Sequence, residues 1–240
     1  MSLSQWLTQQ CEQSFGINLV SILLLGSSQR ADITPFSDID VVVVLKTHET
    51  DQIADLRSRM RSALGLIDCS ILCEDEFPEK ADEFLMGTHG CYHMEMVLKQ
   101  AACLWGHNIF LSFPSPTKEK LEKSVRRKLD EYTWWMRRVY VESNRERTIG
   151  ENHKFNSRLI KMLRDFLFLK GYTTSMTDPV SSVISVFLSA YGSALLDSHE
   201  MQTLSDLSNQ ELANILSANM SEEYLHIRCS IANKIYKHSL

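Results

Sequence analysis

Two stretches near the start of the chain, LLLGSS at residues 23–28 and SDIDVVVVL at residues 37–45, decide the fold. Each contains an apolar run typical of a buried strand, and the first run ends at Gly26, which permits a tight turn. Asp38 and Asp40 stand two positions apart at the start of the second run. Because alternate side chains of a strand point the same way, both carboxylates are expected on one face, with Ile39 packed on the other.

A pair of carboxylates on one face of a strand predicts a site for a hard cation. Like charges held close together repel each other unless a cation joins them. Mg²⁺ prefers oxygen ligands and commonly keeps positions for water and for substrate phosphates. The neighbouring turn predicts a phosphate cradle, since Gly26 permits close approach and the hydroxyls and backbone N–H groups of Ser27 and Ser28 can hold phosphate oxygens.

The loop between the two stretches adds two candidate nucleotide-binding residues. The guanidinium of Arg30 is suited to pair with a triphosphate, although a solvated loop arginine explains it equally well. Ser37 directly precedes Asp38 and is expected to bond locally to the backbone where the loop ends.

A third carboxylate stands in the apolar run LIDCSIL at residues 66–72. A charged Asp68 inside such a strand is costly unless it has a partner or an edge location. Convergence with Asp38 and Asp40 around a metal ion would supply that partner. The alternative is an aspartate at the start of a strand that simply faces water.

In this order of strand, Gly-Ser turn, loop, Asp-x-Asp strand and following acidic strand, the chain resembles the nucleotidyltransferases of the DNA polymerase β type. The resemblance implies two Mg²⁺ ions held by Asp38, Asp40 and Asp68. It also implies transfer of a nucleoside monophosphate, AMP from ATP, to an acceptor hydroxyl with release of pyrophosphate. Asp68 would either bind the catalytic ion or help to remove the acceptor proton.

The expected fold class is α+β, with an N-terminal mixed β-sheet flanked by helices and a C-terminal all-α helical bundle. Prolines and serines in LSFPSP at residues 111–116 favour a domain boundary, which gives a catalytic domain at 1–113 and a helical domain at 114–240. Helical spacing of apolar residues and cap signals predict helices at 2–15, 51–64, 92–100, 117–142, 151–170, 178–196, 208–216 and 221–237. Asp178 is the expected N-cap of the helix at 178–196.

This two-part architecture resembles the aminoglycoside and lincosamide nucleotidyltransferases, which implies a small-molecule acceptor bound partly by the helical domain. Two alternatives stay open: a regulator or antitoxin that nucleotidylates a protein or a tRNA, and an inactive nucleotide-binding module. An acidic run within residues 74–83 either forms a solvated surface or attracts a cationic acceptor electrostatically.

Basic and aromatic residues of the helix at 117–142 have two explanations. The basic side chains either form a solvated face or reach an anion, and one tryptophan of the adjacent pair is expected in the core while the other is free to stack on a ligand. They are Arg126, Arg127, Lys128, Arg137 and Arg138, and Trp134 and Trp135.

Composition limits the remaining classes of function. Among 240 residues the net charge is −5, which disfavours extended nucleic acid as a partner. No apolar run approaches the roughly 20 residues that cross a bilayer, and no signal peptide is recognisable, so we expect a cytoplasmic protein. The six cysteines lack paired C-x-x-C spacing, so free thiols are expected rather than disulfides or zinc ligands. The sequence does not predict the oligomeric state.

Overall fold

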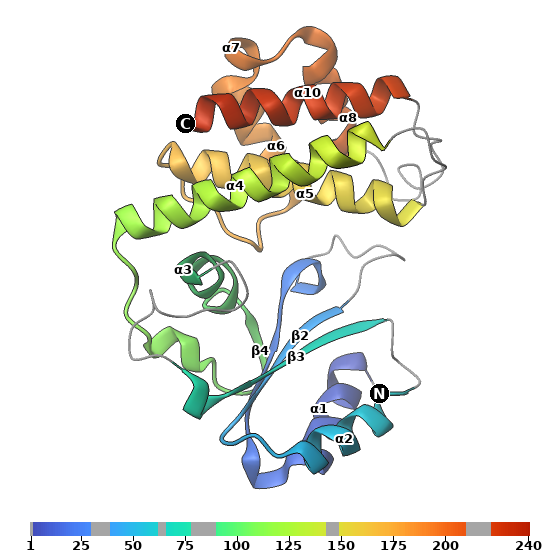
Figure 1. The fold of residues 1–240 in the computed structure, drawn as a ribbon, viewed down its shortest axis with the longest axis vertical. Helices are drawn as coiled ribbons and strands as arrows, with labels where there is room; N and C mark the ends of the chain where they lie inside the picture. The colour runs from blue at the N-terminus through green and yellow to red at the C-terminus, as the bar shows by residue number, and fades with distance from the viewer. Residues whose placement is uncertain (1, 30–38, 62–65, 78–89, 143–148, 210–221) are drawn as a thin grey trace. The chain divides into compact units, whose positions relative to one another are not determined.

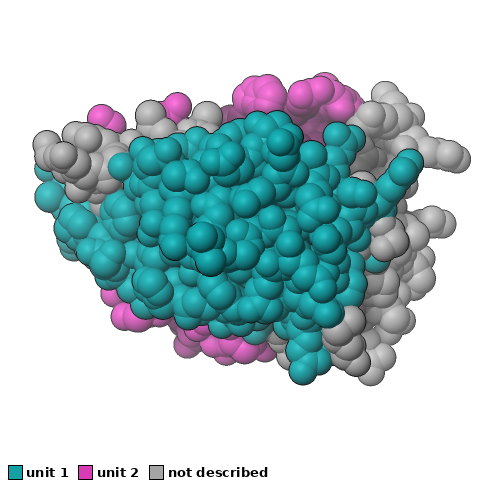
Figure 2. Space-filling view, turned by 90° about the horizontal axis from the view of Figure 1, so that it is seen from below, with its two compact units in different colours: residues 1–120 teal, residues 121–240 magenta. Residues whose placement is uncertain are grey.

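The computed structural model describes residues 2–29, 39–61, 66–77, 90–142, 149–209 and 222–240 (Figure 1). The chain divides into two compact units, Met1–Lys120 and Leu121–Leu240, which are coloured separately in Figure 2. The first unit contains a mixed β-sheet with flanking helices, and the second is built from helices. The predicted α+β fold class is therefore confirmed. The functional domains expected at residues 1–113 and 114–240 stay a prediction.

The sheet of the first unit has four strands in the order β3 (Ile67–Cys73), β2 (Ile39–Leu45), β1 (Leu19–Leu24) and β4 (Ala102–Gly106). Strand β1 runs antiparallel to both of its neighbours, whereas β2 and β3 are parallel. Parallel neighbours need a crossover connection, and the helix α2 (Thr50–Arg59) lies in the connection between β2 and β3. The strands β1, β2 and β3 lie where the apolar runs predicted them.

Helices cover both faces of this sheet (Figure 1). The helices α1 (Leu3–Phe15) and α2 pack on one face, and α3 (Gly90–His93) with its π-helical continuation η6 (Met94–Leu98) lies on the other. Within β2, Val41 and Val43 pack with the α1 and α2 side, and Val42 and Val44 pack with the η6 side. Such a strand, buried on both faces, explains the uninterrupted run of valines.

Short elements complete the first unit. The helix α1 begins at Ser2, whose side chain forms a capping box with Gln5, as a helix start with a serine N-cap predicts. Among the residues that the structure describes, 3₁₀ turns lie in the connections at η1 (Gly16–Asn18), η2 (Gly26–Gln29), η4 (Glu74–Glu76) and η7 (Ile109–Ser112).

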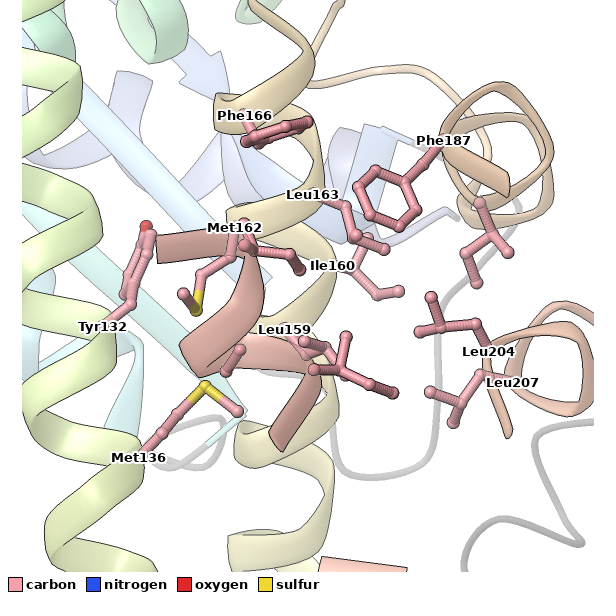
Figure 3. Close-up of a cluster of buried hydrophobic side chains, with 14 of the residues drawn as sticks. Tyr132, Met136, Leu159, Ile160, Met162, Leu163, Phe166, Phe187, Leu204 and Leu207 are labelled. Carbon is pink, nitrogen blue, oxygen red and sulfur yellow. The ribbon is translucent and has the colours of Figure 1, made fainter. Parts of the chain in front are cut away.

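In the second unit, the described residues form seven helical segments. They are α4 (Lys118–Val141), whose first turn belongs to the first unit, α5 (Ile149–Leu169), α6 (Val180–Phe187), the π-helical η8 (Leu188–Gly192), α7 (Ser193–Leu195), α8 (Ser198–Asn209) and α10 (Glu222–Ser239). Their apolar faces meet in one core, in which Tyr132 and Met136 extend from α4 toward Leu159 and Met162 of α5 (Figure 3).

Two predictions in the helical half were wrong. Asp178 does not cap a helix: α6 begins after Pro179, and the Asp178 carboxylate instead accepts a hydrogen bond of 2.6 Å from the backbone N–H of Ser175. The helix α8 was not predicted, although Asp197 and Glu200 form its capping box with two reciprocal bonds of 2.9 Å. The helix expected at 208–216 lies almost entirely outside the described residues.

The described helices include none whose length and hydropathy would suit a membrane span. The cytoplasmic location stays a prediction.

Candidate active site

Asp40 and Asp68 lie side by side at the start of two parallel strands. They are register partners in the ladder between β2 and β3, and neighbouring strands lie about 4.8 Å apart. Asp40 shares its face with Val42, and Asp68 shares its face with Leu72, and both of these apolar residues pack on the η6 side of the sheet. The two carboxylates therefore stand on the same face, whereas Ile39 packs on the opposite face as predicted.

The glycine turn is in direct contact with one of these carboxylates. Gly26 has a φ of 64°, a left-handed conformation that favours glycine. A Cβ atom added to Gly26 would lie 2.6 Å from Oδ2 of Asp40, closer than real contacts of this kind. A residue with a side chain at this position would therefore have to displace the Asp40 carboxylate or the turn.

Two hydrogen bonds to backbone carbonyls fix this arrangement. The N–H of Leu25 donates a bond of 2.9 Å to the backbone carbonyl of Asp40, which extends the β1–β2 ladder up to the turn. The side-chain amide of Gln29 donates a bond of 2.6 Å to the carbonyl of Leu24, which closes the turn from the other end. Gln29 was not recognised from the sequence, and no spacing pattern marks a positioning residue of this kind.

Ligands can reach both carboxylates, because Asp40 is only half-buried and Asp68 is exposed. Cys69 directly follows Asp68 in β3. Burial, with a smaller effect of the Asp68 charge, raises the pKa of the Cys69 thiol to about 11. This thiol therefore stays protonated at neutral pH and contributes no charge beside the carboxylates.

Several of the predicted site residues cannot be placed. Asp38, Arg30 and Ser37 lie outside the described residues. The backbone of Ser27 and Ser28 belongs to η2, and the phosphate-binding role of their hydroxyls stays a prediction. Within the described part of the chain, no three His, Cys, Asp or Glu side chains come together as metal ligands. The six cysteines are free thiols, as expected.

A model of the nucleotidyltransferase domain family matches residues 5–86, the segment that contains the glycine turn and all three predicted aspartates. This segment is a nucleotidyltransferase domain. The resemblance to the DNA polymerase β type is thereby confirmed, and the protein is a nucleotidyltransferase. Its general reaction is transfer of a nucleoside monophosphate.

One solved structure resembles this nucleotidyltransferase over nearly its whole length. The crystal structure of spectinomycin adenyltransferase AAD(9) from Enterococcus faecialis with ATP and spectinomycin aligns with a TM-score of 0.60 and 10% sequence identity, covering 96% of this chain and 97% of that one. At this identity the likeness shows a shared fold. No curated protein sequence matches the chain.

The helical unit contains a group of basic and aromatic side chains on α4 and α5, and the sequence predicted the positions of only some of them. Trp134 is exposed, whereas Trp135 packs against the core, so one tryptophan of the pair is in the core as expected. Lys128 is buried rather than on an open polar face, and its ammonium donates a bond of 3.0 Å to Glu131. Arg158 of α5 lies over the ring of Trp135, 3.6 Å from its centroid. The helical spacing of α5 gave no sign of this arginine.

Proposed function

We propose that this nucleotidyltransferase transfers AMP from ATP to a hydroxyl group of a small-molecule acceptor and releases pyrophosphate. One observation carries the assignment to this part of the sheet. Gly26 lies against the carboxylate of Asp40, and Asp68 is the register partner of Asp40, so a phosphate-binding turn and two acidic side chains meet at one end of the sheet.

The donor set fits a hard divalent cation. Two carboxylates on one face of neighbouring strands, joined by Asp38 two residues before Asp40, offer the oxygen ligands that Mg²⁺ prefers. We assign Asp38, Asp40 and Asp68 as the ligands of two Mg²⁺ ions. When bound, Mg²⁺ would stabilise the charge on the attacking and leaving oxygens of an in-line displacement.

The remaining residues bind and orient the reactants. The backbone N–H groups of the Gly26 turn and the hydroxyls of Ser27 and Ser28 would hold the phosphate oxygens, with Arg30 and Ser37 contributing from the loop. A bond forms between the acceptor oxygen and the α-phosphorus. The bond from the α-phosphorus to the oxygen that bridges it to the β-phosphorus breaks, and pyrophosphate leaves with that oxygen. Asp68, which is exposed, would bind the catalytic ion or help to remove the acceptor proton.

Two observations support a small acceptor. The structurally similar spectinomycin adenyltransferase was crystallised with ATP and spectinomycin, and the likeness extends over both units of this chain. The net charge of −5 disfavours a long nucleic acid as the acceptor.

Label transfer tests this proposal. The protein is incubated with each nucleoside triphosphate labelled at the α-phosphate, with Mg²⁺ or with EDTA, and with pools of small hydroxyl compounds. We expect Mg²⁺-dependent transfer from ATP into a small molecule together with pyrophosphate release. Label in the protein itself or in added tRNA would instead support a nucleotidylating regulator, and binding of triphosphate without pyrophosphate release would support an inactive module.

A further inference from the structure

One face of the helix α4 carries large apolar side chains in contact with solvent. Trp134 is 61% exposed and Val141, two turns further along the same face, is 79% exposed. The guanidinium of Arg138 lies over the ring of Trp134, 5.8 Å from its centroid. An exposed apolar side chain alone does not indicate a partner, so the charges around Trp134 decide what this face can bind.

The charges on this face are separated by sign. Asp130 and Glu131 lie one turn before Trp134, and both are exposed. Arg137 and Arg138 lie one turn after it, and both are exposed as well. Because residues three and four positions apart share a face of a helix, all four side chains flank Trp134. The tryptophan therefore stands between an acidic pair and a basic pair.

This order of charges is complementary to a second copy of itself. Two copies of α4 related by a two-fold axis at Trp134 run antiparallel, and residues before the centre of one copy meet residues after the centre of the other. Arg138 of one copy then meets Glu131 of the other. Arg137 likewise meets Asp130. A parallel arrangement would instead bring like charges together, which is unfavourable.

The next charges outward fit the same antiparallel arrangement. Arg127 lies two turns before Trp134, and Glu142 lies two turns after it, so these opposite charges also meet between copies. Glu142 already pairs with Arg138 at 3.0 Å within the helix, with side chains that are 39% and 59% exposed. Exposed pairs of this kind contribute little stability and can exchange for pairs between copies.

Two other contacts hold the flanking side chains in place. Glu131 binds the ammonium of Lys128 at 3.0 Å, and Nε of Arg137 donates a bond of 2.8 Å to the side-chain oxygen of Asn233. A carboxylate accepts several hydrogen bonds, and a guanidinium has five N–H donors. These contacts therefore orient Glu131 and Arg137 without using their whole hydrogen-bonding capacity.

We infer that the exposed face of α4 centred on Trp134 binds a second copy of this chain, with the two helices antiparallel. Tryptophan and arginine are the residues that most often dominate the binding energy of interfaces, and here they lie at the centre. The face from Arg127 to Glu142 is only about 22 Å long, and a contact of this size buries less area than a standard stable interface. The dimer is therefore weak, with a Kd in the micromolar range. This inference concerns α4 alone and is independent of the proposed reaction.

Analytical ultracentrifugation of the full chain, from micromolar to several hundred micromolar protein, measures this association directly. The wild-type protein should change from monomer to dimer as its concentration rises. Added salt should weaken the dimer, because it screens the exposed charge pairs. Trp134→Ala should raise the Kd at least about tenfold, because it removes the side chain at the centre of the interface.

A charge exchange tests the antiparallel register. Arg127→Glu and Glu142→Arg, each alone, place like charges opposite each other at both ends of the two-fold interface and should weaken the dimer. A mixture of the two variants restores opposite charges at both ends, so heterodimers should form with an affinity near that of the wild type. Recovery in the mixture also shows that each variant is folded.

The chain supplies a matched control. Arg57 is exposed on α2 of the first unit, so Arg57→Glu changes the net charge as much as Arg127→Glu does without altering α4. It should leave the Kd unchanged. A wild-type protein that stays monomeric throughout, or a dimer that tolerates Trp134→Ala and both charge variants, would overturn the inference. A monomer in which added nucleoside triphosphate shifts the Trp134 emission would overturn it too and assign this face to a ligand.

Discussion

Replacement of Gly26 by alanine tests the link between the turn and the acidic site most directly. The new Cβ would lie 2.6 Å from Oδ2 of Asp40, and ordinary contact begins at 3.4 Å, so the carboxylate and the turn must separate by about 0.8 Å. A displacement of about 1 Å in a catalytic group can reduce the rate about 100-fold. The left-handed backbone of Gly26 adds a cost of about 1–2 kcal/mol for any residue with a Cβ.

The control for this variant is Gly171→Ala. Gly171 also has a positive φ, of 86°, but a Cβ there would meet nothing within 4 Å. Both variants should lose about 1–2 kcal/mol in urea unfolding, whereas only Gly26→Ala should lose about 100-fold in AMP transfer. If Gly26→Ala retained transfer within about threefold of Gly171→Ala, contact between the turn and Asp40 would not be part of the site, and our reasoning would be refuted.

Three further predictions concern single side chains. Asp40→Asn and Asp68→Asn should each reduce label transfer at least about 100-fold with an unchanged urea midpoint, and a midpoint that falls together with activity would point to a folding role instead. Glu200→Gln should lower the free energy of unfolding by about 1–2 kcal/mol. The buried Glu200 carboxylate accepts hydrogen bonds from the backbone N–H of Asp197 and from the side chains of Ser230 and Lys234 on α10. An unchanged unfolding curve would contradict this prediction. Burial raises the pKa of Cys11 to about 12, so little of this thiol is ionised at pH 8. Iodoacetamide at pH 8 should therefore modify the exposed Cys103 and spare Cys11. Detection by mass spectrometry that Cys11 is alkylated before Cys103 would disprove this prediction.

The sheet could be predicted well because its sequence signals are local. Alternation of side chains along a strand placed Asp40 and Ile39 on opposite faces, and the run from Val41 to Leu45 indicated burial on both. The register between β2 and β3 could not be predicted, because strand pairing depends on contacts between segments distant in sequence. The structure supplies the pairing of Asp40 with Asp68.

The helical half shows where local signals mislead. Asp178 before Pro179 matches a common helix start, yet its carboxylate bonds backward to Ser175 and leaves the cap without a side-chain bond. The start of the helix α8 is marked in the sequence by the spacing of Asp197 and Glu200, which is the capping-box pattern. The stacking of Arg158 on Trp135 joins two helices, so neither helix reveals it alone.

The pairing of Asp40 with Asp68 also limits how this nucleotidyltransferase can be redesigned. A shift of β3 by a single position would turn Asp68 toward α1 and α2 and bring Ile67 or Cys69 opposite Asp40 in its place. Grafting the Asp-x-Asp motif alone onto another scaffold would therefore transfer two aspartates without the neighbouring carboxylate that the site needs. The smallest segment that could be transferred with its function consists of β2 and β3, the connection between them that contains α2, and the Gly26 turn that contacts Asp40.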